Sequence, residues 1–369
     1  MINVLHIIKS LGRGGAEKLL VETLEQHNKK AYNFHYAYFL PWKDALVKEL
    51  EAAGGKVTCF SAKNNIALFT KVFRLAAYVR ENDIKLIHCH LPWSGIIGRL
   101  VGKLTKIPVV YTEHNIWERY QRVTYLFNKY TFGAQQKVIA VSNEVALSIQ
   151  KNWKHDRPAV EVVNNGVDTQ KFCNLLEQGR DIRKELLIPA NAVVIGATCV
   201  FRKQKRLLAW LEVASELHKK FPGTYFILIG DGVLHDEVHK KAGELGMQRY
   251  LHFAGLQTEV RPYLKAINVF MMSSEFEGLP IALLEAMSMG CMPACTAAGG
   301  IPQVIIHNKN GLLVPVGEPY KLAEVLCKYL ENPSSITCVG TEARRTIVSS
   351  FSIKKMVADI EQIYKNLTQ

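Results

Sequence analysis

Short apolar runs alternate along most of this chain with longer segments in which apolar residues recur every three or four positions. The short runs predict buried strands and the longer segments predict amphipathic helices, because these are the periods at which side chains return to one face. The expected strands are 2–8, 34–39, 84–89, 107–112, 137–141, 193–198, 224–229, 250–253, 268–273 and 291–295. The expected helices include 16–28, 67–81, 205–221, 233–245 and 318–331.

This alternation predicts an α/β protein with parallel sheets that are covered by helices on both faces. It falls into two blocks, so we expect two Rossmann-like, doubly wound domains, at 1–170 and 171–351. The boundary lies near 164–190, where Asn164–Asp168 has the composition of a turn and a polar stretch follows. Ligands of such sheets bind beyond the carboxyl ends of the strands, so we expect the site in a cleft between the two domains.

The composition agrees with a globular protein. Of 369 residues, 48% are hydrophobic and 21% are charged, and the length suits two domains. No apolar run reaches the roughly 18 residues of a membrane span. The first residues lack a basic segment and favour a core strand over a signal peptide, so we expect a cytoplasmic protein.

The formal net charge is +13, and it is concentrated in the first half of the chain. Residues 1–170 carry 23 basic and 14 acidic side chains, a net of +9. An anionic membrane surface or a phosphorylated acceptor would suit this excess, as would simple solubility. The sequence contains no helix-turn-helix, zinc-finger or RNA-binding signature, so we expect no nucleic-acid partner.

A glycine-rich segment, Gly12–Glu17, follows the first expected strand and begins a helix. Glycines at a helix N-terminus let backbone amides approach a phosphate, although an ordinary strand–helix turn has the same spacing. Glu17 stands where the third glycine of a dinucleotide fingerprint would fall, which argues against a nicotinamide cofactor.

A basic segment, Phe201–Arg206, follows the strand 193–198 and has four cations within five positions. Cations at a helix N-terminus oppose the helix dipole, so local stability does not favour them. A bound diphosphate would reverse that balance, and a solvated basic turn is the alternative.

The segment Ser273–Met287 is the most informative motif. Pro280 suits a first helical turn, Gly290 suits the C′ position, and the helix between them is almost wholly apolar. Glu285 is the one charge in this helix, and a buried carboxylate needs partners, either an internal cation or a pair of ligand hydroxyls. Glu277 precedes the helix, beside the backbone of residues 278–281 at the start of the helix.

Three weaker signals stay open. His88 and His90 share one face of a strand, but no third ligand at a recognisable spacing accompanies them. We therefore expect a cleft-facing histidine that helps to shape the acceptor site rather than a metal site. A stripe over 66–80, comprising Phe69, Val72, Phe73, Ala76 and Val79, fits core packing or an interfacial helix. The segment Trp117–Arg122 suits a sugar or phosphate acceptor and equally a solvated loop.

Taken together, several motifs resemble the family 4 retaining glycosyltransferases of GT-B fold, also called glycosyl transferases group 1. The resemblance follows the order and spacing of these motifs along the whole chain: Gly14–Glu17, Asn165–Asp168, Gly230–Gly232, Glu277–Pro280 with Glu285, Gly299–Pro302 and Asn310–Pro315. In this family the last helix crosses back onto the N-terminal domain, and residues 352–369 resemble it.

The resemblance implies a role for each matching residue. Glu285 would hold the donor ribose, and Glu277 with the backbone of Gly278, Leu279, Pro280 and Ile281 would hold the donor sugar. Arg202 and Lys205 would neutralise the diphosphate, Gly255 would lie by the base, and Gly14 and Gly15 would approach from the other domain. His114 falls where the family has a histidine near the sugar and acceptor, which makes His114, Glu277, Arg202 and Lys205 the expected catalytic residues.

Two positions depart from the family pattern. Arg202 and Lys205 are three residues apart, where many members space them five apart, and Val200 occupies the usual arginine position. A subset of the family carries a variant similar to Phe201–Arg206. Gln303 stands where glutamate is common, which removes one charge near the cleft.

The sequence thus predicts a retaining glycosyltransferase that uses a UDP- or GDP-linked sugar as co-substrate, without a cofactor or a metal. The expected acceptor is a glycolipid or polyprenyl-linked intermediate of bacterial surface polysaccharide, with the enzyme peripheral on the inner membrane face. Two alternatives stay open: a nicotinamide-dependent oxidoreductase, and a non-catalytic family member that binds a nucleotide sugar or a membrane.

Overall fold

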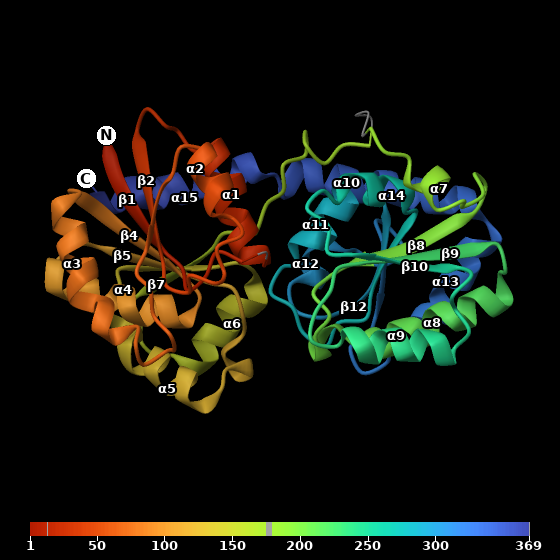
Figure 1. Cartoon of the computed structure of the whole chain (residues 1–369), viewed down its shortest axis with the longest axis horizontal. Coiled ribbons are helices and arrows are strands. Elements are labelled where there is room, and N and C mark those ends of the chain that lie inside the picture. Colours follow the sequence, from red (N-terminus) through yellow and green to blue (C-terminus); the bar gives the residue numbers. More distant parts are fainter. Residues whose placement is uncertain (13, 175–178, 369) are drawn as a thin grey trace. The chain divides into compact units, whose positions relative to one another are not determined.

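The computed structural model describes residues 1–12, 14–174 and 179–368, so Arg13 of the glycine-rich segment lies outside it (Figure 1). Contacts divide the chain into two compact units. Unit 1 comprises Met1–Asn165 and Ile353–Gln369, and unit 2 comprises Gly166–Ser352. Each unit has its own sheet and hydrophobic core.

Unit 1 is built on a parallel seven-stranded sheet with the order β3-β2-β1-β4-β5-β6-β7. Since β1 lies between β2 and β4, the ends of β1, β4 and β5 are close together although they are distant in sequence. The strands are β1 (Ile2–Ile7), β2 (Tyr32–Tyr38), β3 (Lys56–Cys59), β4 (Ile84–His90), β5 (Val109–Glu113), β6 (Lys137–Ala140) and β7 (Ala159–Val162).

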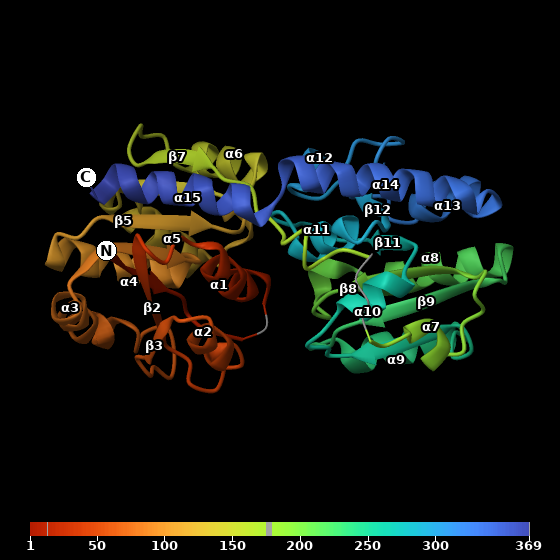
Figure 2. The same ribbon diagram turned by 90° about the horizontal axis from the view of Figure 1, so that it is seen from above.

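Helices cover both faces of this sheet. The last helix, α15, lies against α1 and β4, whereas α3 packs on α4, and α4 packs on β4 and β5 (Figure 2). The helices are α1 (Gly15–Gln26), α2 (Val47–Ala52), α3 (Val72–Glu81), α4 (Pro92–Thr105), α5 (Arg122–Thr131), α6 (Asn143–Asn152) and α15 (Ile353–Thr368), with 3-10 turns η1 (Phe69–Lys71), η2 (Trp117–Arg119) and η3 (Phe132–Ala134).

Unit 2 has a parallel six-stranded sheet with the order β10-β9-β8-β11-β12-β13. Its residues alternate between two buried clusters: in β9, Phe226 and Leu228 face one cluster, and Ile227 and Ile229 face the other. Both faces of the sheet are therefore covered. The strands are β8 (Val193–Thr198), β9 (Thr224–Ile229), β10 (Leu251–Gly255), β11 (Val269–Met272), β12 (Met292–Thr296) and β13 (Leu312–Val314).

The helices of unit 2 lie on the two faces of its sheet. Figure 1 shows α10, α11 and α14 on one face and α8, α9 and α13 on the other. The helices are α7 (Ile182–Glu185), α8 (Leu207–Lys220), α9 (His235–Glu244), α10 (Arg261–Ala266), α11 (Ile281–Ser288), α12 (Ile301–Val304), α13 (Lys321–Glu331) and α14 (Pro333–Ser350), with the 3-10 turn η4 (Lys203–Lys205).

The expected α/β architecture of two doubly wound parallel sheets is confirmed, and all ten expected strands are present within a few residues of their expected ends. Sequence analysis missed β3, β7 and β13. These are short strands at sheet edges, where only one neighbouring strand pairs, so their residues need not form a buried apolar run. In β7, for example, Val162 is exposed.

Two smaller expectations are corrected. The stripe over 66–80 splits, because Val72, Ala76 and Val79 are buried whereas Phe73 is 76% exposed. Trp117 is buried in the core, so Trp117–Arg122 is not simply a solvated loop.

Candidate functional site

The basic segment after β8 forms a short 3-10 turn, η4, that brings a lysine against a glutamate. Lys205 Nζ lies 2.5 Å from Glu277 Oε1, and the two side chains are only 16% and 7% exposed. Arg202 is exposed at the start of the turn. Of these two basic side chains, Lys205 is therefore paired inside the protein, and Arg202 is exposed to solvent.

Two glycines hold this turn in place. A Cβ on Gly232 would lie 2.6 Å from the carbonyl oxygen of Phe201 and 2.7 Å from its nitrogen, and one on Gly230 would overlap Cys199. The backbone of the β9–α9 loop thus runs directly along the segment that leads into the basic turn. Phe201 N–H donates to the carbonyl of Asp231 at 2.9 Å.

The end of β11 supports the same turn from the other side. Ser273 Oγ donates to the carbonyls of Lys205 at 2.8 Å and Arg206 at 3.1 Å. The loop that carries Glu277 begins here, so hydrogen bonds from the Ser273 side chain to the backbone of the turn help to set the Lys205–Glu277 pair. At the edge of this region, Gly255 has φ +65° and its carbonyl accepts from the N–H of Gly230 at 2.8 Å.

Helix α11 begins at Ile281, directly after Pro280, and it is buried over most of its length. Glu285 lies within it and is only 3% exposed. Gly290 follows the helix with φ +87°, the left-handed conformation expected at its C′ position.

The loop before α11 exposes backbone more than side chains. Leu279 and Ile281 bury their side chains, so only their main-chain groups can face a ligand. The N–H of Gly300 donates to the carbonyl of Gly278 at 2.6 Å and thereby fixes the loop. Backbone N–H groups at a helix N-terminus suit oxygen-rich ligands such as a sugar.

Unit 1 contributes the glycine-rich segment and His114. Gly14 is the N-cap of α1 and Gly15 is its first residue. A Cβ on Gly14 would meet the carboxylate of Glu17, whose Oε1 accepts from Ser10 Oγ at 3.1 Å. The Glu17 carboxylate therefore occupies space that is available only because residue 14 is a glycine.

His114 follows β5, and a buried carboxylate holds the loop that begins there. Glu113 accepts hydrogen bonds from Tyr111 OH at 2.9 Å and from Trp117 Nε1 at 3.0 Å, and also from Tyr120 OH. Its Oε1 accepts from the backbone N–H of His114 at 3.1 Å. Burial raises the pKa of the Glu113 carboxyl, and these donors oppose that rise.

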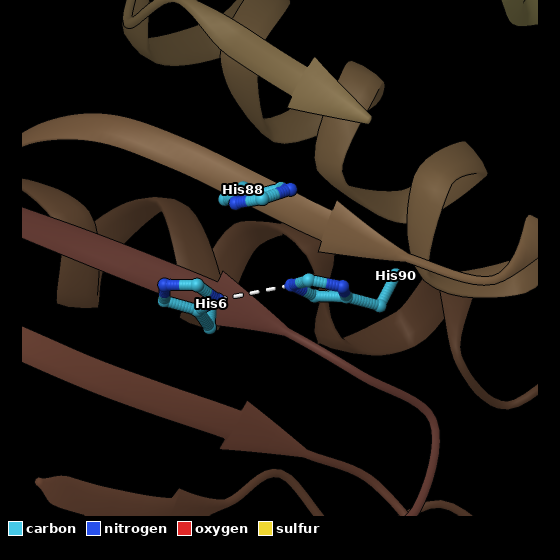
Figure 3. Close-up of side chains that lie close together, drawn as sticks. All are labelled: His6, His88 and His90. Carbon is cyan, nitrogen blue, oxygen red and sulfur yellow. Dashed lines mark hydrogen bonds between the residues drawn. The ribbon is translucent and has the colours of Figure 1, made fainter. Parts of the chain in front are cut away.

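The structure brings a third histidine to the pair that sequence analysis singled out. The expectation of no third partner is wrong: His6 from β1 joins His88 and His90 from β4, with ligand atoms of all three within 4.8 Å of one another (Figure 3). His6 Nδ1 lies 2.9 Å from His90 Nε2. The strand order that is typical of doubly wound sheets could have revealed this third histidine. In such sheets the first strand, which carries His6, lies in the middle of the sheet, beside strands that follow later in the chain.

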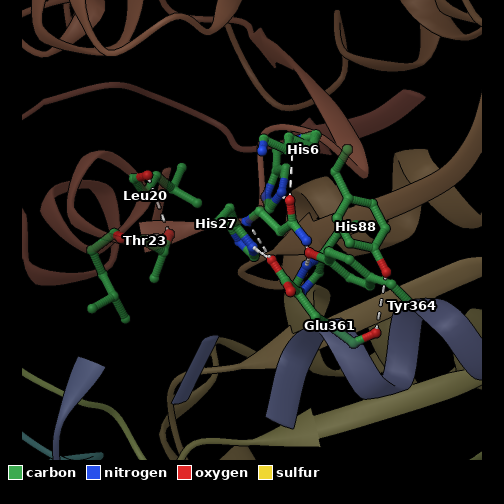
Figure 4. Close-up of polar contacts among 11 residues, drawn as sticks. His6, Leu20, Thr23, His27, His88, Glu361 and Tyr364 are labelled. Atoms are coloured by element: carbon green, nitrogen blue, oxygen red, sulfur yellow. Dashed lines mark hydrogen bonds and ion pairs between the residues drawn. The ribbon is translucent and has the colours of Figure 1, made fainter. Parts of the chain in front are cut away.

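Helix α15 adds polar groups to the same region. Tyr364 OH lies 2.5 Å from His88 Nδ1, and Glu361 Oε1 lies 2.8 Å from His27 Nδ1 (Figure 4). The histidines and Tyr364 line a cavity of about 20 Å³, which His114 also borders. Sequence analysis did not find Tyr364, Glu361 or His27 as members of this cluster, because α15 is distant in sequence from the strands it covers.

The predicted residues therefore fall into two groups. Unit 2 brings together Lys205, Glu277 and the amides before α11, with Arg202 at the rim of the turn and Gly255 at the end of β10. Unit 1 contains Gly14, Gly15 and His114.

Known proteins were compared with this chain in sequence and structure. A model described as Glycosyltransferase Family 4 matches residues 13–171, and one described as Glycosyl transferases group 1 matches residues 178–347.

The curated relatives include bacterial polysaccharide enzymes. The UDP-Gal:alpha-D-GlcNAc-diphosphoundecaprenol alpha-1,3-galactosyltransferase of Escherichia coli is 26% identical over 297 residues, which cover 78% of this chain and 76% of that protein. The lipopolysaccharide core biosynthesis glycosyltransferase LpsE of Rhizobium meliloti is 32% identical over 200 residues, or 54% of this chain and 55% of that protein.

Among solved structures, Anabaena HepE in complex with UDP-glucose is similar with a TM-score of 0.88 and 19% identity, covering 99% of this chain and 100% of that one. The lipopolysaccharide outer core galactosyltransferase WaaB is similar with a TM-score of 0.74 and 16% identity, covering 99% of this chain and 100% of that one. At these identities the similarity shows a shared fold.

Proposed function

This chain belongs to the group 1 glycosyltransferases of family 4, and from that premise we propose that it transfers a sugar, with retention, from a nucleoside-diphosphate sugar to an acceptor hydroxyl. The observation that carries the proposal is the buried Lys205–Glu277 pair at the start of the loop that leads to Glu285. It places a cation for a diphosphate beside a carboxylate and a helix N-terminus for hydroxyl groups.

In the proposed reaction, the bond between the anomeric carbon and the diphosphate oxygen breaks, and a bond to the acceptor oxygen forms on the same face. The acceptor proton passes to the departing diphosphate oxygen. Lys205 and Arg202 stabilise the negative charge that develops on this leaving group. Lys205 is held ready by Ser273 and Glu277, so little reorganisation is needed.

The remaining proposed contacts to the donor involve the two buried carboxylates, Glu285 and Glu277, and the backbone next to Glu277. Glu285 is the carboxylate of α11 and accepts from the two ribose hydroxyls. Glu277 and the backbone N–H groups of Gly278, Leu279 and Ile281 hold the sugar. Gly255 lies near the base. We assign donor binding to unit 2, and we assign the acceptor side, with Gly14, Gly15 and His114, to unit 1.

A UDP-linked sugar is the donor we propose. Two findings support it: the E. coli relative is named for UDP-Gal, and HepE is described in complex with UDP-glucose. The same E. coli relative acts on a sugar linked to diphosphoundecaprenol, so we propose a polyprenyl-diphosphate-linked acceptor of surface polysaccharide synthesis.

The test is a thermal-shift series with UDP, GDP, ADP and NADH on the wild type, Glu285→Gln and Glu244→Gln. A ligand that binds the native state raises the melting temperature. We expect UDP to stabilise the wild type and the control, in which an exposed glutamate of α9 is changed, but not Glu285→Gln. A shift with GDP alone would correct the base, and a shift with NADH alone would contradict the donor site.

We propose in addition that unit 1 docks on an anionic membrane surface. Helix α5 has the opposite polarity to an ordinary surface helix. It buries the polar residues Thr124 and Asn128 and exposes an apolar face, here called the α5 face. The α5 face comprises Val123, Leu126, Phe127 and Tyr130, of which Tyr130 is 92% exposed. Ring contact between Phe69 and Phe127, with centroids 5.9 Å apart, joins it to the segment before α3.

Charge on the same elements fits this occupant. Arg119, Arg122 and Lys129 are exposed around the α5 face, and an amphipathic surface of apolar and basic groups suits anionic headgroups. No helix among the described residues is long and apolar enough to cross a bilayer. Peripheral attachment to the inner face of the cytoplasmic membrane is therefore the localisation we propose.

Vesicle flotation tests this proposal. Phe127→Ser should lower the bound fraction on phosphatidylglycerol vesicles several-fold, whereas Val233→Ser, which changes an exposed residue of unit 2, should leave it unchanged. Equal flotation of both variants and the wild type would contradict the α5 face as the contact.

A further inference from the structure

A continuous series of hydrogen bonds runs through the core of unit 1 and ends at His114. We call it the histidine chain, and its members, in order of contact, are Thr112, His88, Tyr364, His6, His90 and His114. The distances along it are 2.7, 2.5, 3.4, 2.9 and 3.5 Å. Figure 3 shows the link between His6 and His90, and Figure 4 shows how α15 brings Tyr364 against His88.

The four imidazoles of the chain are neutral near pH 7. Burial lowers the pKa of His88 to about 3 and of His114 to about 4, and it lowers the pKa of His6 and His90 well below the ordinary value. A neutral imidazole carries one proton, so one ring nitrogen donates and the other accepts. If one nitrogen of a ring accepts a hydrogen bond, the other nitrogen of that ring must donate. All hydrogen bonds of the series therefore run in the same direction.

The first member of the chain sets this direction. Thr112 Oγ1 is in a residue only 3% exposed, and within the described residues His88 Nε2 is its one hydrogen-bond partner. If His88 donated to Thr112, the hydroxyl proton would have no acceptor among the residues that the structure describes, at a cost of about 1–3 kcal/mol. Thr112 therefore donates to His88 Nε2.

The rest of the chain follows from that one donor. His88 carries its proton on Nδ1 and donates to Tyr364 OH, which is protonated because burial raises its pKa well above the ordinary value. Tyr364 then donates to His6 Nε2, the other ring nitrogen within reach.

His6 in turn carries its proton on Nδ1 and donates to His90 Nε2. His90 then donates from Nδ1 to His114 Nε2. With Nε2 of His114 accepting, the proton of this neutral ring must lie on Nδ1.

We propose that the histidine chain fixes His114 as the Nδ1–H tautomer, so that His114 acts as a hydrogen-bond donor rather than as a base. The ligand group it would recognise is an oxygen with a free lone pair, a sugar hydroxyl or a phosphate oxygen. This inference deepens the proposed function, on which the identity of that ligand rests. Thr112, His88, Tyr364, His6 and His90 are positioning residues that act through His114.

The test reads the tautomer directly. The full-length protein is labelled with ¹⁵N-histidine, and a long-range ¹⁵N–¹H correlation spectrum shows which ring nitrogen bears the proton; loss of one signal set in His114→Gln assigns His114. We expect the Nδ1–H form in the wild type. Thr112→Val removes the hydroxyl at constant shape, and the ratio of Nδ1–H to Nε2–H should fall about tenfold. Thr112→Ser keeps the hydroxyl and should keep the ratio.

Tyr364→Phe interrupts the chain at its middle and provides a second variant if Thr112→Val does not fold; it should also lower the ratio. An Nε2–H or charged His114 in the wild type would overturn the proposal, as would a ratio unchanged in both hydroxyl-free variants. Because the spectra are recorded without nucleotide, this failure is distinct from a failure of UDP to stabilise the protein.

Discussion

At the scale of single residues, the buried carboxylate of Glu113 organises the loop that begins at His114. Glu113 gathers donors from three aromatic side chains and from the backbone N–H of His114. It therefore joins the core of unit 1 to the loop that begins at His114. Sequence analysis named the segment around Glu113 only for its histidine, since nothing in a local pattern shows that a carboxylate will meet tyrosines and a tryptophan in the fold.

Glu113→Gln tests this role. A glutamine amide brings N–H donors to a position surrounded by donors, so at least one hydrogen bond is lost and buried groups are left unsatisfied. We expect the free energy of unfolding to fall by about 2–3 kcal/mol in urea denaturation. Glu161→Gln is the control, because it breaks a surface pair with Lys137 that contributes at most about 1 kcal/mol. Equal effects of the two variants would contradict the argument.

Gly232 tests the close approach that holds the basic turn. A methyl group at Gly232 would press on the backbone of Phe201, and backbone cannot move aside as a side chain can. Gly232→Ala should lower stability by about 2 kcal/mol and weaken UDP binding at least several-fold. Gly223→Ala adds a methyl group where nothing lies within 4 Å and should change neither quantity. Calorimetric titration with UDP measures the binding, and urea denaturation measures the stability of each variant.

At the scale of elements, the order of parallel strands places the chemistry. Adjacent strands β1, β4 and β5 end together, and this brings His6, His90 and Thr112 within one cluster. Helix α15 closes the cluster with Tyr364. Strand order in a doubly wound sheet is not a local property, so the pair on one strand was visible in the sequence and the full cluster was not.

The same histidines make the stability of the protein depend on pH. Their pKa values are depressed in the folded state, to about 3 for His88 and about 4 for His114, whereas the unfolded chain takes up protons below about pH 6.5. Their stabilising contribution is therefore present above pH 6.5 and is lost as the pH falls toward 4. Nearby, Glu361 Oε1 lies 2.8 Å from His27 Nδ1.

We expect the free energy of unfolding to fall between about pH 6.5 and pH 4.5. In His90→Gln, which has one histidine fewer, the slope should be shallower by up to about 1.4 kcal/mol per pH unit. His155→Gln is the control, since His155 is exposed. Urea denaturation across this range measures the slopes, and identical slopes in wild type and His90→Gln would contradict burial of neutral histidine.

Helix α5 shows where a sequence pattern alone is ambiguous. Apolar residues at 123, 126, 127 and 130 have helical spacing, which would ordinarily predict a face turned to the core. In the fold this face is exposed, because the other side of the helix faces the buried Arg99. The guanidinium of Arg99 donates hydrogen bonds to Asn128 Oδ1 and Thr131 Oγ1 there. The hydrogen bonds of the buried Arg99 thus determine which side of α5 faces the core, and the apolar periodicity does not.

At the scale of the whole molecule, the chain is two units with separate sheets and cores. The net charge of +13 is carried mostly by the first half, which supplies most of unit 1. Long-range attraction to an anionic surface weakens with ionic strength, since the screening length falls from about 10 Å at 0.1 M salt to about 3 Å at 1 M.

We therefore predict that binding to anionic vesicles is salt-dependent. The apparent affinity should fall by at least about tenfold between low salt and about 0.5 M salt, because each basic side chain near the surface contributes about 1 kcal/mol at moderate salt. Vesicles of neutral phosphatidylcholine should bind weakly at both concentrations. Sedimentation of the wild-type protein with each lipid measures this, and salt-independent binding would contradict a basic docking surface.

The amino-acid sequence by itself determined the α/β class, ten of the strands that the structure describes and the motifs of a family 4 glycosyltransferase, because periodicity, turn residues and motif spacing are local properties. It did not determine the edge strands β3, β7 and β13, the orientation of α5 or the histidine chain. These depend on which strands become neighbours and on which polar groups must be satisfied once buried. Only the tertiary structure settles such pairings, because their members lie up to hundreds of residues apart, as His6 and Tyr364 do.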